Sequence, residues 1–210
     1  MRRTTDAYAS LQSLGRPVVT TRDAAVTWGE SLPTTARTLA RLAGAGLVTK
    51  VRQGIWTIGN GAVDPTYVLP ILTNPFPSYV SGWSALFAHG MIEQIPHSVF
   101  AVSLDRPKTI DTEIGRFEIH RVQPEIFGGF DGGSGSQAGV ARSEKALFDT
   151  VYVFVVHRGH VTLPELELPE SFDESNLNHW IDAVTSERLR TMVRRALSKL
   201  IDGAALESAS

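Results

Sequence analysis

The sequence predicts an α+β protein built from two domains, and three features of the chain support this prediction. Apolar residues recur at helical spacing in several segments and form short β-rich runs in others. The first 60 residues contain eight basic and three acidic residues, a net charge of +5, whereas the remaining 150 residues have a net charge of −7. A short glycine-containing stretch at 59–64 separates the two regions. We therefore predict domains at 1–61 and 62–203, followed by a disordered tail at 204–210.

Three short helices are predicted within the first 45 residues. Apolar residues at three-residue steps indicate the first, at 6–14. The second, at 24–28, follows Thr20 and Thr21, and threonine commonly caps helix N-termini. The third begins with Ser31 as a possible cap, has a proline in its first turn and runs to Gly44. The inward face of the third helix is predicted to consist of Ala36, Leu39, Ala40 and Leu42 or Ala43.

A β-hairpin is predicted directly after the third helix. Two β-rich runs, 47–51 and 55–58, flank a short turn that contains Gly54. Three short helices followed by a hairpin is the element order of a winged helix-turn-helix, with the hairpin as the wing. Together with the net positive charge, this order predicts that the first domain binds double-stranded DNA.

The predicted DNA contacts lie on the helices and on the wing. In a helix-turn-helix, the second helix of the pair enters the major groove, and we expect it to present Arg37 and Arg41 on one face. Arginine can donate two hydrogen bonds to guanine, and threonine suits a phosphate oxygen or a thymine methyl group. The full predicted set is Arg22, Thr34, Thr35, Arg37, Thr38, Arg41, Arg52 and Gln53. Two alternatives remain: the arginines are simply solvated, or the domain binds protein instead of DNA.

The second domain is predicted to be mixed, with a small sheet. Strands are expected at 99–104 and 117–122, and residues 128–139 are expected to form a mobile glycine-rich loop. Residues 166–175 form an acidic, proline-containing stretch. Helices are expected at 66–72, 80–90, 143–156, 176–184 and 186–201.

Three stretches of this domain, at 79–96, 114–128 and 140–149, resemble the AbiEi-type antitoxin family, the regulators of abortive-infection toxin–antitoxin pairs. The third, which reads VARSEKALFD, is the most specific. With the N-terminal domain included, the likeness covers about 6–152. The resemblance implies that the N-terminal domain represses its own operon and that the C-terminal domain counteracts a nucleotidyltransferase-type toxin, by contact or functionally. It implies no catalytic residues.

The residues of the third stretch also suggest structural roles. Ser143 can cap a helix, and Leu147 and Val151 would face inward. Lys145 and Asp149 are spaced as a surface ion pair of a helix, worth about 0.2–0.5 kcal/mol. We therefore interpret the stretch as mainly fold-determining.

No motif of the sequence indicates an enzyme. Cysteine is absent, which excludes disulfides and cysteine-based sites. His157 and His160 have a spacing that some metal sites use, but no carboxylate motif accompanies them. The chain contains no phosphate-binding loop and no nucleophile elbow, so we predict no catalytic residue, metal or other cofactor. Neither a membrane span nor a signal peptide is evident, so we expect no membrane partner and a cytoplasmic location.

Taken with the winged-helix pattern and the charge asymmetry, the resemblance to the AbiEi-type family implies an antitoxin that also represses its own promoter. The alternative is a winged-helix repressor without a toxin partner, whose acidic second domain senses a small ligand. A third possibility, an enzyme fused to a DNA-binding domain, has no motif to support it.

Overall fold

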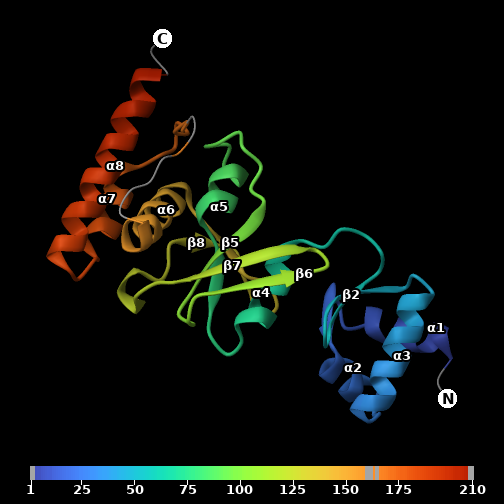
Figure 1. Ribbon diagram of the computed structural model, residues 1–210. Coiled ribbons are helices and arrows are strands. Elements are labelled where there is room, and N and C mark those ends of the chain that lie inside the picture. Colours follow the sequence, from blue (N-terminus) through green and yellow to red (C-terminus); the bar gives the residue numbers. More distant parts are fainter. Residues whose placement is uncertain (1–2, 159–162, 164–165, 208–210) are drawn as a thin grey trace. The chain divides into compact units, whose positions relative to one another are not determined.

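The computed structural model describes residues 3–158, 163 and 166–207. Within them the chain is α+β, with eight α-helices and two β-sheets (Figure 1). It divides into two compact units. Unit 1 consists of Met1–Val68 and Asp111–Gly115, and unit 2 consists of Leu69–Ile110 and Arg116–Ser210.

Unit 1 contains three helices and a three-stranded antiparallel sheet of order β1-β3-β2. The three predicted helices and the predicted hairpin are confirmed, but β1, which pairs with β3, was not predicted because it is only three residues long. The elements are α1 (Thr4–Gln12), β1 (Val18–Thr20), α2 (Thr21–Trp28), α3 (Leu32–Gly44), β2 (Val48–Arg52) and β3 (Ile55–Ile58).

Local sequence explains where α2 and α3 begin. Thr20 caps α2 as predicted: its hydroxyl accepts from the Asp23 amide, and the Asp23 carboxylate accepts from the Thr20 amide. Ser31 lies at the N-cap of α3, but its side chain makes no capping hydrogen bond and pairs instead with the Thr34 hydroxyl at 3.0 Å. The three helices close over a core that includes Leu11, Val19, Trp28, Leu39, Leu42 and Trp56.

Most of the second sheet lies in unit 2, and its six strands have the order β6-β7-β5-β4-β9-β8. The predicted strands at 99–104 and 117–122 correspond to β5 and β7, which pair in parallel, and all five predicted helices are present with shifted ends. The strands are β4 (Ser78–Val80), β5 (Ser98–Ser103), β6 (Lys108–Thr112), β7 (Gly115–Arg121), β8 (Phe130–Asp131) and β9 (Gly139–Ala141). The helices are α4 (Pro65–Thr73), α5 (Gly82–Ala88), α6 (Ser143–Arg158), α7 (Glu174–Asp182) and α8 (Glu187–Glu207), with a 3₁₀ turn at Pro124–Ile126.

Helix α6 is the centre of unit 2. It packs against α5, α7 and α8, and Figure 1 shows α7 and α8 beside α6 on the side away from the sheet. Ala146, Leu147, Phe148 and Val151 of α6 are all buried. Because both sides of α6 are covered, its apolar residues surround the helix instead of forming one stripe.

The glycine-rich stretch at 128–139 is more ordered than the sequence predicts. Its ends form β8 and β9, which pair with each other, and β9 also pairs in parallel with β4. Gly129 has a φ of +71°, and a Cβ there would lie 2.6 Å from Cζ2 of Trp180. A Cβ at Gly139 would lie 2.5 Å from the Phe130 ring. These glycines allow close packing at the sheet edge, so the prediction of a simple mobile loop is wrong there.

Three further expectations concern the C-terminal part and the membrane. Helix α8 continues to Glu207, so the first residues of the predicted disordered tail at 204–210 are helical, while 208–210 lie outside the described residues. His160, half of the predicted histidine pair, also lies outside them. Among the described residues, no helix combines the length and apolar character needed to cross a bilayer.

Candidate nucleic-acid interface

The outward face of α3 carries two arginines among small side chains. Thr34 and Arg37 are exposed and Arg41 is half-exposed, as the sequence predicts. Ala36 and Ala40, predicted to face inward, are instead exposed between them. Helix α3 contains no acidic residue. Its outer surface is therefore basic. The small side chains between the two arginines let a ligand approach the helix closely.

Two of the predicted contact residues are wrongly placed. Thr35 is completely buried and Thr38 is 8% exposed, so neither can contact DNA. Because α3 has about 3.6 residues per turn, Thr35, Thr38 and Leu42 fall on one face with Leu39. That face packs inward, and Ala36 and Ala40, which we assigned to it, occupy the outer face instead.

The turn between β2 and β3 presents a second exposed basic group. Arg52 and Gln53, both predicted contacts, are exposed at this turn. Thr49 and Lys50 of β2 are also exposed, whereas Val48 is buried. Lys50 is not among the predicted contacts, although its position in the predicted hairpin indicated it.

Arg22 is exposed in the first turn of α2 and has no ion-pair partner among the described residues. Its acidic neighbour Asp23 is engaged elsewhere: it accepts from the Thr20 amide and hydroxyl at 2.8 Å each and pairs with Arg16 at 3.0 Å. Burial alone would raise the pKa of Asp23, but the hydrogen bonds from Thr20 and the charge of Arg16 lower it overall. Arg22 is therefore available for an external anion.

The stretch that most resembles the antitoxin family forms a buried polar cluster in unit 2. Lys145 and Asp149 of α6 form an ion pair with both side chains completely buried, so the prediction of a surface pair is wrong. The Tyr79 hydroxyl donates to Asp149 Oδ2 at 2.9 Å and the Ser81 hydroxyl donates to the same atom at 2.7 Å. Asp149 thus connects α6 to β4 and to the residue that follows it.

Aromatic rings surround the ammonium group of Lys145. Its Nζ lies 4.8 Å from the Trp180 ring centroid, 4.9 Å from that of Phe148 and 5.5 Å from that of Tyr79. Burial lowers the pKa of Lys145, opposed by the charge of Asp149. Burial also raises the pKa of Tyr79, and Asp149 raises it further. The aromatic rings and the Asp149 carboxylate together compensate for the free-energy cost of removing the Lys145 ammonium group from water.

Glu144, the preceding residue, is also structural. It is 5% exposed, and its Oε1 accepts from the Asp173 amide at 2.9 Å. Asp173 in turn caps α7 by accepting from the Ser175 amide. Consecutive residues of the third stretch therefore hold β4, α6 and the start of α7 together, which supports a fold-determining role.

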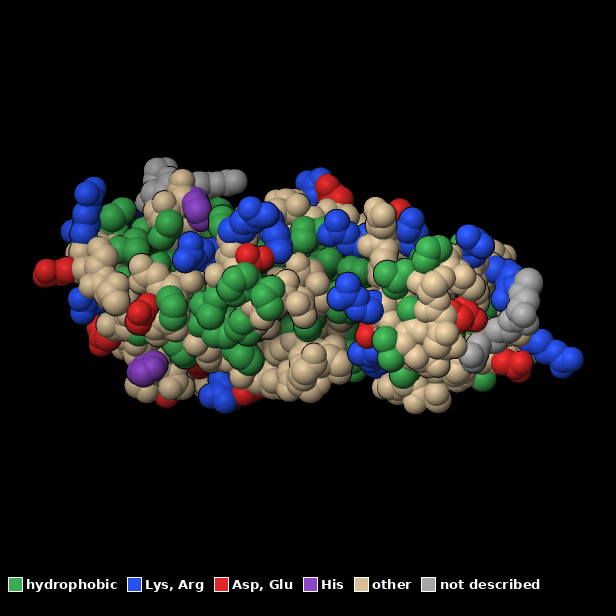
Figure 2. All heavy atoms as spheres, turned by 90° about the horizontal axis from the view of Figure 1, so that it is seen from below, with side chains coloured by type: hydrophobic (Ala, Val, Ile, Leu, Met, Phe, Trp, Pro, Cys, Tyr) green, Lys and Arg blue, Asp and Glu red, His purple; other side chains and the backbone are tan. Residues whose placement is uncertain are grey.

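The two regions differ in net charge, but each of them contains both basic and acidic side chains. Figure 2 shows basic side chains spread over much of one face of the molecule, with acidic ones among them. Helix α8 alone carries several exposed basic residues: Arg188, Arg194, Arg195 and Lys199. Of these, Arg194 pairs with Asp182 at 2.6 Å.

Comparison with known proteins leaves the family open. No protein-family model matches the sequence, and no curated protein matches it significantly, so the resemblance to the AbiEi-type family stays a prediction. Within the described residues, no three side chains of His, Asp or Glu are grouped as a metal site would require.

Proposed function

We propose that the chain is a DNA-binding autorepressor and the antitoxin of a toxin–antitoxin pair. In this proposal unit 1 is a winged helix-turn-helix that binds promoter DNA, and unit 2 counteracts a nucleotidyltransferase-like toxin. The observation that carries the DNA-binding part is the outward face of α3, a helix without acidic residues, on which Arg37 is exposed and Arg41 is half-exposed.

The arrangement of α2 and α3 supports the first part. The two helices pack together and are joined by a short turn that includes Gly29, which has a left-handed φ of 64°. The second helix of such a pair is the one that enters the major groove. Ala36 and Ala40 leave room for base edges near the α3 backbone, and the two arginines flank them with planar groups that can pair with guanine.

The exposed β2–β3 turn fits the role of a wing. Arg52 and Lys50 can contact phosphates or an adjacent minor groove, and Gln53 can donate hydrogen bonds there. Arg22, exposed at the start of α2, is a candidate phosphate contact of the helix pair. Contacts of this kind increase affinity for any DNA sequence and weaken as salt rises.

The antitoxin part rests on the family resemblance and on the net negative charge of the second region. Glu167, Glu170 and Glu174 are exposed in the acidic stretch and in the first turn of α7. An acidic surface of this kind favours encounter with a protein whose active site binds nucleic acid. The buried cluster around Lys145 is inaccessible, so a toxin would contact other residues.

DNA binding is tested with the full-length protein and DNA from its own promoter, with random DNA as the comparison. Arg37→Ala and Arg41→Ala should each lose about 5- to 150-fold in discrimination, or about 1–3 kcal/mol. Arg52→Ala should weaken binding to both DNAs. Arg106→Ala, an exposed arginine of unit 2, is the matched control. Equal losses on both DNAs for the α3 variants would contradict base contacts by this helix.

Antitoxin activity is tested by growth rescue in cells that express the toxin encoded beside this gene. Full-length Arg37→Ala/Arg41→Ala should still rescue growth while it fails to repress the promoter. Replacing Glu167, Glu170 and Glu174 with Gln should reduce rescue, with Glu187→Gln on α8 as the control. Loss of rescue in the arginine variant would show that protection works through DNA and would contradict the proposed division of roles.

A further inference from the structure

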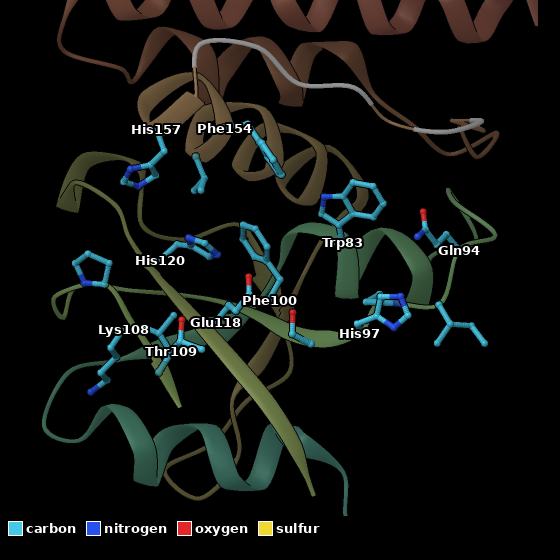
Figure 3. A pocket seen from close by; sticks show the side chains of 16 residues that line it. Trp83, Gln94, His97, Phe100, Lys108, Thr109, Glu118, His120, Phe154 and His157 are labelled. Atoms are coloured by element: carbon cyan, nitrogen blue, oxygen red, sulfur yellow. The ribbon is translucent and has the colours of Figure 1, made fainter. Parts of the chain in front are cut away.

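A cavity of about 650 Å³ opens in unit 2. Its lining residues come from α5, α6, strands β5 to β7 and the segment before β5, and all of them belong to unit 2 (Figure 3). This volume is within the range of small-molecule sites in proteins. The proposed DNA-binding and antitoxin roles do not use the cavity.

Flat aromatic side chains form the walls of this cavity. Figure 3 shows Trp83 on α5, Phe154 on α6, and Phe100 and His120 on neighbouring strands. The rings of Phe100 and His120 are stacked, with centroids 4.1 Å apart and an interplanar angle of 27°. Such walls offer stacking surfaces for a planar ligand.

Glu118 supplies the acceptor group of the cavity. It lies two residues from His120 on β7, so both side chains are on the same side of the sheet, and Phe100 is the register partner of Glu118 on β5. Glu118 is half-buried and has no ion-pair partner among the described residues. A carboxylate in this position can accept two hydrogen bonds from adjacent N–H groups of one ligand.

The cavity offers little positive charge for a phosphate. Lys108 is the one lysine or arginine in its described lining, and its Nζ already donates to Asp105 Oδ2 at 2.6 Å and to the Leu72 carbonyl at 3.0 Å. Burial lowers the pKa of His120 to about 4, against the charge of Glu118 and with that of His157, so this ring is neutral at pH 7. A ligand with a phosphate would face Glu118 with no free lysine or arginine among the described lining residues to balance its charge.

We propose that this cavity binds a planar nitrogen heterocycle of nucleobase or nucleoside size, without a phosphate group. The ring stacks on the aromatic walls, and two adjacent N–H groups of its edge donate to the Glu118 carboxylate. Guanine presents such a pair, its ring N1–H and its exocyclic amino group, so guanosine is the best probe. The inference is independent of the proposed function, because it depends on unit 2 alone and requires neither DNA nor a toxin.

The test is calorimetric titration of the full-length protein with guanosine, inosine and guanosine 5′-monophosphate. Guanosine should bind saturably. Inosine, which lacks the amino group, and the monophosphate should each bind at least about tenfold more weakly. Absence of saturable guanosine binding, or equal affinity for guanosine and inosine, would overturn the proposal. Monophosphate binding as tight as that of guanosine would overturn it as well.

Two pairs of variants locate the site. Glu118→Gln should weaken guanosine binding by about 10- to 150-fold, the effect of losing hydrogen bonds to a charged group, whereas Glu187→Gln should leave it unchanged. Phe154→Ala should weaken it too, with Phe76→Ala as its control, because Phe76 is exposed and lies outside this cavity. Urea unfolding of each variant confirms that it is folded. Folded Glu118→Gln and Phe154→Ala proteins that bind guanosine normally would overturn the assignment.

Discussion

The surface of unit 1 and the core of unit 2 use basic side chains in opposite ways. Arg37 and Arg52 are exposed and have no ion-pair partner among the described residues. Lys145 is completely buried, paired with Asp149 and surrounded by aromatic rings. An exposed charge contributes little to folding and remains available to a ligand, whereas a buried charge is committed to its neighbours and fixes how they pack. The position of a basic residue, more than its type, therefore indicates what it does.

The largest expected effect on stability comes from breaking the buried ion pair between Lys145 and Asp149. Lys145→Ala leaves the Asp149 carboxylate buried with two hydroxyl donors and no cation, so the free energy of unfolding should fall by about 3–5 kcal/mol. Urea unfolding measures it. Arg142→Ala is the control, because the Arg142–Asp131 pair is exposed and its loss should not shift the midpoint. Equal shifts in the urea midpoint for the two variants would contradict the proposed difference between buried and exposed charges.

A second prediction concerns pH and His120. The folded pKa of His120 is about 4, against 6.5 for the free side chain, mainly because of burial, and its Nε2 has no hydrogen-bond partner among the described residues. An unfolded chain therefore takes up a proton at a higher pH than the folded one. Stability from this residue is constant above pH 6.5 and is lost as pH falls from 6.5 towards 4, by about 2–3 kcal/mol.

The test is urea unfolding of the parent and His120→Phe proteins across this pH range. The parent should show the slope and the variant should be flat. Aspartates with lowered pKa values, such as Asp23 and Asp173, titrate below their ordinary 3.8 and contribute mainly at lower pH. The same slope in both proteins would assign the effect to another group.

A smaller effect is expected at the glycine-rich edge of unit 2. Gly129→Ala adds a Cβ at a left-handed backbone position, against the same Trp180 ring that covers Lys145. We expect a loss of about 1–2 kcal/mol from strain and overpacking. Gly135→Ala in the same stretch is the control, because a Cβ there meets no atom within 4 Å. Equal stability of the two variants would mean that this edge of the sheet accommodates the added Cβ without a loss of stability.

The smallest effect should be on the stability of unit 1. Arg37→Ala and Arg52→Ala should change the free energy of unfolding by less than about 0.5 kcal/mol, because neither side chain has an ion-pair partner to lose within the part of the chain that the structure describes. Thermal unfolding beside the DNA titrations separates the two roles. A stability loss as large as that of Lys145→Ala would show that these arginines are structural and would remove the contrast between the units.

The sequence predicts most helices and the unit 1 hairpin because their signals are local. The Thr20 cap, the proline that opens α3 and the dense apolar residues of α6 each act within a few residues. Strands β1, β8 and β9 are too short to carry such a signal, and long-range partners decide them. The misplaced Thr35 and Thr38 have a related cause, because threonine tolerates either face of an amphipathic helix and alanine does so as well.

The residues of the candidate sites also differ in whether local sequence is enough to predict them. Charge and element order point to Arg37, Arg41 and Arg52, since exposed residues need no partner to be recognised. The burial of Lys145 could not be predicted, because its i,i+4 spacing with Asp149 is equally typical of a surface pair. The acceptor Asp149 is reached by Tyr79 and Ser81 from about 70 residues earlier in the chain. The cavity around Glu118 likewise depends on elements that are distant in the sequence.

The long separation between Asp149 and its donors also sets an order of events during synthesis. The core of unit 1 lies between Ala7 and Ile58, so its residues are all available early. The contact between β4 and Asp149 cannot form until Asp149 has been synthesised. The set of aromatic rings around Lys145 is complete only when Trp180 has left the ribosome. At about 5–20 residues per second, the interval from Tyr79 to Trp180 lasts about 5–20 s. Asp149, the acceptor for the Tyr79 hydroxyl, follows 70 residues after Tyr79, or about 3.5–14 s later at this rate. Until then Tyr79 and Ser81 lack their final acceptor, and nascent unit 2 is exposed to chaperones and proteases while the core of unit 1 can already form.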